Sequence, residues 1–387
     1  MAMSKLPLIV FAQFACTSLW FAGNALLGPL AETFHLDDAV LPHLTSAVQL
    51  GFITGTLLFA LLNLADRMSP SKLFFINALL GALFNLAMVW EGNTLESLLG
   101  LRFLTGLVLA GIYPVGMKIA ADYFEKGLGL ALGYLVGALV LGTAFPHLLN
   151  SLGSGYDWTN LVFAISGLAL TGGLMVFIGV PDGPYRKAGK GLQVSALKAV
   201  FRIPAFRKAA FGYFGHMWEL YTFWALVPWM LRYHFSQTGI EWSISAWSFG
   251  IIAIGGLACV LGGYLAVRYG AAVIAHFALG ISGVACLLSP WVLASTSSTL
   301  VLTFLLIWGM AVIADSPLFS SLVAQASPAE IRGSALTLVN SIGFSITILS
   351  IQLLFALLDK DFGLWPLLFL AIGPASGLLY IAKKTQP

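Results

Sequence analysis

The stretch Leu62-Asn-Leu-Ala-Asp-Arg-Met-Ser-Pro-Ser-Lys72 separates two long apolar runs with an acidic and a basic residue, a Ser-Pro turn and a lysine. Such an interruption is typical of a short hinge loop between two membrane helices. A related stretch, Gly263-Tyr-Leu-Ala-Val-Arg-Tyr-Gly270, follows about 200 residues later, since aligning Val267 with Asp66 gives an offset of 267 − 66. This offset is slightly more than half of the 387-residue chain, so the recurrence predicts two halves that each contain a hinge.

The composition of the chain is that of a membrane protein. Hydrophobic residues make up 59% of the sequence and charged residues only 9%, with a mean hydropathy of +0.92, whereas soluble domains carry charge on roughly a quarter of their residues. The net charge of +3 gives no reason to expect a nucleic-acid partner. Cys16, Cys259 and Cys286 lie in separate apolar runs without the spacing of metal ligands. We therefore expect a polytopic membrane protein with neither a metal site nor a cofactor.

Twelve apolar runs are long enough to cross a bilayer as helices, because a spanning helix needs about 20 residues. The runs are 6–31, 43–65, 72–90, 97–121, 127–151, 160–180, 207–232, 242–266, 271–292, 298–324, 332–357 and 363–382. The sequence therefore predicts an all-α membrane protein with twelve transmembrane helices in two six-helix pseudo-repeats. Residues 1–180 form the predicted N-terminal bundle, 181–206 a basic cytoplasmic linker, and 207–387 the C-terminal bundle.

The positive charges predict how the chain is oriented. If the N-terminus is cytoplasmic, most of the 19 lysines and arginines lie on the cytoplasmic side and only Arg232 and Lys360 fall in outer loops. Because short cytoplasmic loops hold such an excess, we predict that both termini are cytoplasmic and expect a bacterial inner (plasma) membrane location. The apolar and basic residues of the predicted linker 181–206 favour a basic helix anchored on the inner leaflet, with regulation of transport as the alternative.

A second repeat has nearly the same offset as the hinge. Gly129-Leu-Ala-Leu132 begins the fifth run and Gly333-Ser-Ala-Leu336 the eleventh, an offset of 333 − 129, again about 200 residues. Both stretches follow a small and polar segment that ends the preceding helix. Two repeats at one offset strengthen the prediction of two equivalent halves.

The whole chain resembles the major facilitator superfamily of secondary transporters, whose hinge motif is Gly-x-Leu-Ala-Asp-Arg-x-Gly-Arg-Arg/Lys. Residues that match or nearly match it are Leu64, Ala65, Asp66, Arg67 and Lys72 in the first hinge, and Gly263, Leu265, Ala266, Arg268 and Gly270 in the second. Val267 replaces the aspartate of the second copy. Ala314-Asp-Ser-Pro317 and Arg332-Gly-Ser-Ala-Leu336 loosely resemble the cyanate- and nitrate-permease-like branch. The resemblance implies two six-helix halves that expose a central site to one side of the membrane at a time.

Ionisable side chains within the apolar runs are candidate functional residues, because placing one in a bilayer costs about 2.5–3.5 kcal/mol. Glu219 lies near the middle of the seventh run with His216 one turn earlier. A carboxylate away from water can exchange a proton near neutral pH, so we assign Glu219 and His216 to proton coupling. The alternative is a carboxylate fixed by His216 or by a neighbouring helix.

Two further ionisable residues are assigned to proton coupling. Asp315 precedes a Ser-Pro pair that permits a kink, and it is either a second protonation site or a structural partner near a helix break. Arg102 lies early in the fourth run, where its guanidinium could bind an anionic substrate or influence a carboxylate. A bridge from Arg102 to a neighbouring helix is the alternative.

The family resemblance also implies a cytoplasmic gate at the hinge. In that family an acidic residue at the inner end of helix 4 receives the hinge arginine, so we predict that Arg67 pairs with Asp122 when the inner side is closed. Asp66 then faces the N-terminus of the eleventh helix. Lys118, one turn before Asp122, is expected to be structural. We also assign Arg268 and Arg332 to this gate. We expect the first hinge to carry most of the control, since the second lacks the aspartate.

Polar and aromatic side chains in the runs are candidates for binding a solute. Trp20 and Asn24, one turn apart in the first run, are the best pair. The other candidates are Gln49, Tyr113, Trp218, Tyr221, Trp224 and Asn340. Amides in lipid also join helices, and buried aromatic rings more often pack than bind ligands, so packing is the alternative role for these residues.

The sequence contains no Walker loop, nucleophile elbow or metal-ligand cluster, so it shows no machinery for ATP-driven pumping or enzymatic catalysis. We predict secondary active transport of a small polar or anionic organic solute by alternating access, with proton symport. One alternative is a proton-coupled exporter of amphiphilic compounds or drugs, although the exporters' helix-5 signature is poorly kept. Another is a solute sensor that does not transport. The expected partners are the solute, protons and the lipid bilayer, and we expect a monomer.

Overall fold

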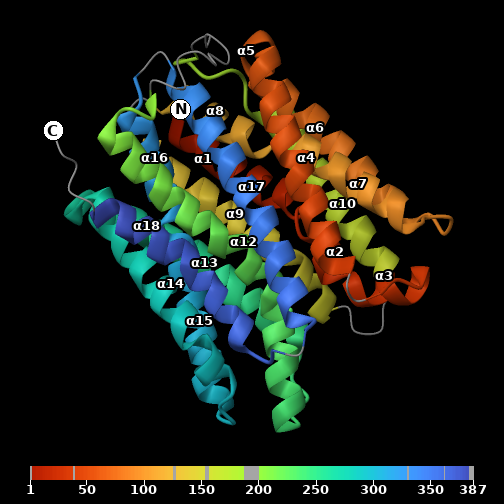
Figure 1. Cartoon of the computed structure of the whole chain (residues 1–387). Coiled ribbons are helices and arrows are strands. Elements are labelled where there is room, and N and C mark those ends of the chain that lie inside the picture. Colours follow the sequence, from red (N-terminus) through yellow and green to blue (C-terminus); the bar gives the residue numbers. More distant parts are fainter. Residues whose placement is uncertain are drawn as a thin grey trace. The chain divides into compact units, whose positions relative to one another are not determined.

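The computed structural model describes residues 2–37, 40–124, 128–152, 157–186, 200–328, 331–360 and 362–382. Regular secondary structure in these ranges is helical throughout. The chain divides into two compact units, Met1–Gly191 and Leu192–Pro387, which run from red to yellow-green and from green to blue in Figure 1. Residues 187–199, which include most of the predicted basic linker helix, lie outside the described ranges.

The first unit is built from ten α-helices. They are α1 (Ala2–Thr17), α2 (Ala22–Ala25), α3 (Leu27–Phe34), α4 (Leu41–Leu62), α5 (Leu64–Arg67), α6 (Pro70–Leu86), α7 (Leu95–Leu109), α8 (Tyr113–Tyr123), α9 (Leu128–Leu152) and α10 (Trp158–Gly179), with a 3-10 turn η2 (Ala87–Val89) after α6, as far as the structure describes the chain. The main packing pairs are α4 with α7, α6 with α10, and α1 with both α9 and α10.

Several of the described helices of the second unit are long. Its described helices are α12 (Pro204–Thr238), α13 (Ile244–Tyr269), α14 (Ala271–Leu293), α15 (Ser298–Ala314), α16 (Ser316–Ala326), α17 (Arg332–Leu358), η4 (Trp365–Ala371) and α18 (Ile372–Ala382). Helix α12 packs against α16, α17 and α18, while α15 packs against α13 and α14. Helix α12 therefore lies at the centre of this unit's contacts.

Ten helical segments among the described residues are long and apolar enough to cross a membrane. They coincide with ten of the twelve predicted runs. The predicted run 6–31 is divided among α1, α2 and α3, of which only Lys5–Thr17 forms a shorter apolar helix. The predicted run 207–232 lies within α12, which carries charged residues at its start and in its middle. The number twelve thus depends on counting these two segments as spans.

Two of the predicted helices are each interrupted once by a proline. The interruptions lie between α7 and α8, just before Pro114, and between α15 and α16, just before Pro317. Proline lacks the N–H that would bond the carbonyl four residues earlier, so the helix can bend there. The two prolines are 317 − 114 = 203 residues apart.

Close helix packing occurs in both units at the same offset. A Cβ atom added at Gly106 of α7 would clash with the backbone carbonyl of Val48 on α4. One added at Gly309 of α15 would clash with the carbonyl of Ile251 on α13. Both differences, 309 − 106 and 251 − 48, are again 203. Small residues allow backbones in lipid to approach this closely, and each unit uses a glycine for such a contact.

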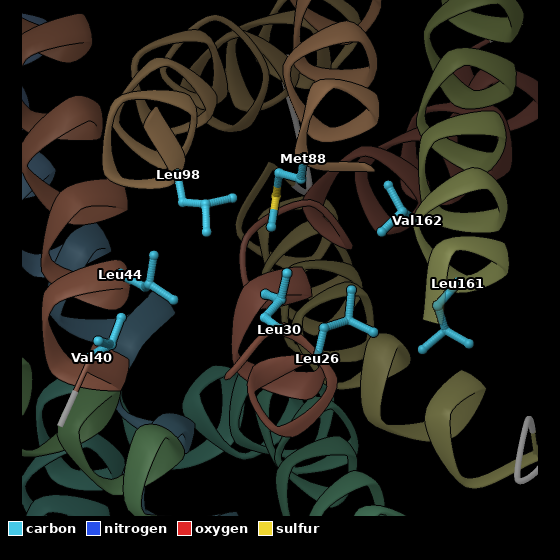
Figure 2. Packing of buried hydrophobic residues seen from close by; sticks show 8 residues of the cluster. All are labelled: Leu26, Leu30, Val40, Leu44, Met88, Leu98, Leu161 and Val162. Atoms are coloured by element: carbon cyan, nitrogen blue, oxygen red, sulfur yellow. The ribbon is translucent and has the colours of Figure 1, made fainter. Parts of the chain in front are cut away.

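The first predicted helix is broken at residues 18–21, where a turn separates α1 from α2. A cluster of buried apolar residues packs around the segment that follows the break, at α3: Leu26, Leu30, Val40, Leu44, Met88, Leu98, Leu161 and Val162 (Figure 2). These side chains come from the region of α3 and from α4, η2, α7 and α10. Leu19, Trp20 and Phe21 of the break are themselves at most 1% exposed, so the break lies in the packed interior of the first unit.

The predicted hinge contains a short helix of its own. Helix α4 ends at Leu62, and the next residue, Asn63, has a φ of 54° in the left-handed region that asparagine tolerates better than most residues. Helix α5 follows directly, and Pro70 begins α6 at the first helical position, where proline is favoured. Asp66 and Arg67 thus lie on α5 between two turns.

Candidate functional site

Buried polar side chains of the second unit gather where α12, α14 and α15 pack together. Glu219 and His216 come from α12, Ser282 from α14, Trp308 from α15, and Asp315 from the junction of α15 and α16. All five are at most 1% exposed. We call these five residues the buried acidic site.

Glu219 is bound by side chains from two other helices. Its Oε1 accepts a hydrogen bond of 2.6 Å from Nε1 of Trp308, and its Oε2 lies 2.9 Å from Oγ of Ser282. The thiol of Cys286, one turn after Ser282, also interacts with this carboxylate. Glu219 therefore joins α12 to α14 and α15. The same contacts can hold a structural carboxylate or position a proton-exchanging one.

Asp315 and His216 form the other half of the buried acidic site. Nδ1 of His216 lies 2.8 Å from Oδ1 of Asp315, so the pair connects α12 to the break between α15 and α16. Oδ2 of Asp315 and Nε2 of His216 are buried and have no hydrogen-bond partner among the described residues. Buried polar atoms are nearly always hydrogen-bonded, so these two atoms are the unsatisfied part of the buried acidic site among the described residues.

A thiol supports the same helix break. Pro317 cannot donate to the carbonyl of Ile313, four residues earlier. Sγ of Cys259 on α13 lies 3.5 Å from that oxygen and supplies a weak donor. The bend at Asp315 is thus held from a third helix.

Arg102 lies at the break of the first predicted helix. It is 1% exposed, and its guanidinium donates from Nη1 to the carbonyl of Leu19 at 3.1 Å and from Nη2 to the carbonyl of Trp20. Gly23 leaves room for this side chain, because a Cβ atom there would lie 3.3 Å from Nε of Arg102. The described partners of Arg102 are backbone carbonyls, so its contacts are those of a bridge from α7 to the first helix.

Three predicted solute-binding residues meet at the contact of the first helix with α4. Nδ2 of Asn24 donates to Oγ1 of Thr45 at 3.0 Å, and the ring of Trp20 packs on Phe52 with centroids 4.8 Å apart. Gln49 lies on the same helix between Thr45 and Phe52 and is fully buried. Neither its amide nitrogen nor its amide oxygen has a hydrogen-bond partner within the described ranges.

Three of the other predicted solute-binding residues lie on α12 and contact neighbouring groups of the second unit. Nε1 of Trp218 donates to the carbonyl of Phe369 at 2.8 Å, and the rings of Tyr221 and Trp224 are 5.2 Å apart. The partly exposed candidates are Tyr113 at the start of α8 and Asn340 on α17. Trp218, Tyr221 and Trp224 thus contribute to the packing around α12, the alternative role that the sequence allowed.

The first hinge forms an ion pair through Asp66. Oδ1 of Asp66 lies 2.8 Å from Nζ of Lys118 on α8, and Lys118 is 4.0 Å from Oδ1 of Asp122. Arg67 is exposed and takes part in none of the ion pairs that the described residues form. In this conformation Lys118, and not Arg67, connects the hinge to the end of α8.

The two remaining gate residues are exposed. Arg268, near the end of α13, places its guanidinium carbon 5.2 Å from the ring centre of Tyr269. Arg332 is the first residue of α17. Neither belongs to an ion pair within the described part of the chain. Their assignment to a gate therefore stays a prediction.

Residues 180–186, directly after α10, form a strap that the hydropathy pattern does not predict. Side chains and the strap's own arginine fix it to the hinge and to α8 through these hydrogen bonds: Ser71 Oγ to Val180 O at 2.6 Å, Ser69 Oγ to Asp182 Oδ1 at 2.6 Å, Tyr123 Oη to Pro181 O at 2.6 Å, and Arg186 Nη2 to Met68 O at 2.7 Å and Asp66 O at 3.1 Å. A Cβ atom at Gly183 would clash with the backbone of Asp122. The Pro-Asp-Gly-Pro sequence at 181–184 was the available signal, since it is typical of a tight turn.

No group of three or more His, Cys, Asp or Glu side chains that could hold a metal ion occurs among the described residues. Long apolar helices, interrupted spans and buried ionisable groups instead define an integral membrane protein of the transporter class. The sequence model of the Major Facilitator Superfamily matches residues 9–351, so the chain belongs to this superfamily.

Several known transporters are similar to part of the chain. Efflux pump FUBT of Fusarium oxysporum is 28% identical over 189 residues, which cover 47% of this chain and 31% of the pump. The uncharacterised MFS-type transporter YybF of Bacillus subtilis is 27% identical over 45% of this chain and 44% of its own length. Niacin transporter NiaP of Acinetobacter baylyi is 28% identical over 47% of this chain and 44% of its own length. The matched regions thus span less than half of each relative.

Proposed function

We propose that this member of the superfamily is a secondary active transporter that moves a small polar or anionic organic solute together with protons. The observation that carries the proposal is the buried acidic site. Its two carboxylates, Glu219 and Asp315, connect α12 to α14, to α15 and to the break before α16. Ionisable groups are costly at this depth, which favours a functional role for such a group of them.

Protonation of the site can be transmitted to the helices that form it. A proton on Asp315 or Glu219 changes a contact between helices, and so changes the relative stability of two arrangements of the bundle. A proton that crosses a potential of 100 mV provides about 2.3 kcal/mol, enough to bias such an equilibrium. The interrupted helices α7–α8 and α15–α16 offer the points of bending that alternating access requires.

Residues of the first unit support the proposal that the solute is polar. The fully buried amide of Gln49 offers a donor and an acceptor that no described residue uses, and Asn24 and Trp20 lie on the facing segment. Arg102 is occupied by two backbone carbonyls, so we expect it to contribute less to recognition than these amides. The similarity to a niacin transporter is in keeping with a small organic solute.

The wider architecture of the proposal is twelve helices in two equivalent halves. It is supported by the offset of 203 residues that relates the two prolines and the two close helix contacts. Cytoplasmic termini, a bacterial inner membrane and a monomeric state belong to the same proposal.

Reconstitution of the purified protein in liposomes containing a pH-sensitive dye tests this function. Niacin and a panel of small polar and anionic metabolites are added outside, and proton entry and solute uptake are recorded. We expect one compound to drive proton entry, and Glu219→Gln to abolish proton-driven uptake while leaving solute counterflow intact. Solute flux that moves no protons and is unchanged in both Glu219→Gln and Asp315→Asn would overturn the proposal.

Export of amphiphilic compounds or drugs is the second candidate, favoured by the similarity to an efflux pump and to multidrug transporters of Edwardsiella. The same liposomes distinguish the two directions. An exporter would release a preloaded dye or drug when protons flow in the opposite direction. A symporter would instead accumulate solute as protons enter down their gradient.

A further inference from the structure

The hydroxyl of Ser282 has two acceptors within reach and a single proton to donate. Its Oγ lies 2.9 Å from Oε2 of Glu219 and 3.2 Å from the carbonyl oxygen of Leu279, one turn earlier on α14. A serine hydroxyl donates one hydrogen bond and can accept others, whereas a backbone carbonyl only accepts. Ser282 can therefore direct its proton to Glu219 or to Leu279.

Trp308 determines which oxygen of Glu219 is free to bind a proton. The indole N–H is a donor only, and it lies 2.6 Å from Oε1. Oε1 is therefore an acceptor whether Glu219 is charged or neutral. An added proton belongs on Oε2, which is the oxygen that faces Ser282.

We propose that Ser282 is a positioning residue whose hydroxyl rotates to let Glu219 gain and lose the coupling proton without movement of the carboxylate. This inference rests on the proton coupling proposed above. When Glu219 is charged, Ser282 O–H donates to Oε2. When a proton from water binds Oε2, the new O–H of Glu219 donates to Ser282 Oγ, and Ser282 O–H donates to the carbonyl of Leu279.

Both states keep every heavy atom in place and leave no polar atom of this group without a partner. One proton enters and one O–H bond forms on Glu219, while the serine keeps its own proton. Removal of the proton reverses both hydrogen bonds. A buried carboxyl group can thus change its charge without losing a hydrogen bond. Loss of a hydrogen bond to the charged form would otherwise shift the midpoint of its titration by about one to two pH units.

Other titratable groups act on Glu219 from the elements around it. The thiol of Cys286 acts on it from α14, and the charge of Asp315 acts on it from the junction of α15 and α16. His216 lies one turn earlier on α12 and contacts Asp315. A test of Ser282 therefore needs a background in which Asp315 is replaced by asparagine, so that a change at Glu219 is separated from a change at Asp315.

Infrared spectroscopy of the purified full-length protein can measure the protonation of Glu219 directly. The carbonyl stretch of the protonated acid, identified by its loss in Glu219→Gln, is titrated with pH in the wild type, Ser282→Ala and Ser282→Thr. Ser289→Ala is the matched control, because Ser289 is also buried on α14 and donates only to its own helix, at the carbonyl of Cys286, 2.8 Å away. Each titration is repeated with Asp315→Asn.

We expect Ser282→Ala to shift the midpoint by about one pH unit to higher pH, because the charged carboxylate loses its donor. Ser282→Thr, which keeps the hydroxyl, and Ser289→Ala are expected to titrate like the wild type. An unshifted midpoint in a folded Ser282→Ala protein would overturn the inference. A Ser282-dependent titration in a protein whose liposomes show no solute-driven proton flux would support the role of Ser282 in the protonation of Glu219 and reject the proposed transport coupling.

Discussion

Lys118 lies 2.8 Å from Asp66, and this ion pair fastens the short hinge helix α5 to α8. The two side chains are 24% and 15% exposed, so water screens the pair only in part. Asp122, one turn further along α8 and 4.0 Å from the same ammonium group, adds a second carboxylate. The first hinge is therefore held within its own unit by a lysine that the hinge motif does not contain.

Removal of either partner should have the same effect. Asp66→Asn and Lys118→Gln are each expected to lower the free energy of unfolding by about 0.5–1 kcal/mol. The double variant should lose no more than a single variant does, because both substitutions remove the same contact. Thermal unfolding in detergent measures this, with solute uptake recorded in parallel. Arg67→Gln is the control, since Arg67 is exposed and belongs to no ion pair among the described residues. If Arg67→Gln were the damaging change and Lys118→Gln were neutral, the predicted pairing of Arg67 with Asp122 would be favoured.

The strap at 180–186 should be sensitive to a single methyl group. Gly183→Ala places its Cβ against the backbone of Asp122, so we expect a loss of about 1–3 kcal/mol in stability and faster proteolysis near the hinge. Gly179→Ala is the matched control, because its Cβ would only make an ordinary contact of 3.5 Å with Leu8. Equal unfolding temperatures of the two variants would show that the strap does not hold the hinge.

Arg102 should contribute to folding more than to recognition. Arg102→Lys keeps the charge but cannot reach two carbonyls with a planar fork, so we expect a loss of about 1–3 kcal/mol in stability. Solute affinity of the folded fraction, measured by equilibrium binding, should change less than threefold, or about 0.7 kcal/mol. A much larger loss of affinity in a stable Arg102→Lys protein would instead place the guanidinium at the solute.

Hydropathy and the two hinges were enough to predict a helical membrane protein and the positions of its long helices, because these depend on local composition. The sequence pattern does not predict the break at 18–21, because its residues are as apolar as their neighbours and Arg102, which donates to its carbonyls, lies 82 residues beyond Trp20. Ser282 and Trp308 were missed for a similar reason. Neither residue is unusual within an apolar run, and only tertiary packing brings them to Glu219.

Variants of His216 and Asp315 test most directly whether Asp315 is a protonation site or a structural contact. Asp315→Asn has nearly the same shape but cannot bind the coupling proton, so we expect solute uptake driven by a pH gradient to fall by at least about tenfold, while counterflow persists. His216→Gln keeps a side chain that can donate to Asp315 and is expected to retain part of the uptake with an altered pH profile. If the pair is only structural, both variants should lower the unfolding temperature by similar amounts and leave the pH dependence of uptake unchanged. Parallel measurement of the unfolding temperature and the pH profile of uptake therefore decides between the two interpretations of Asp315 that the sequence left open.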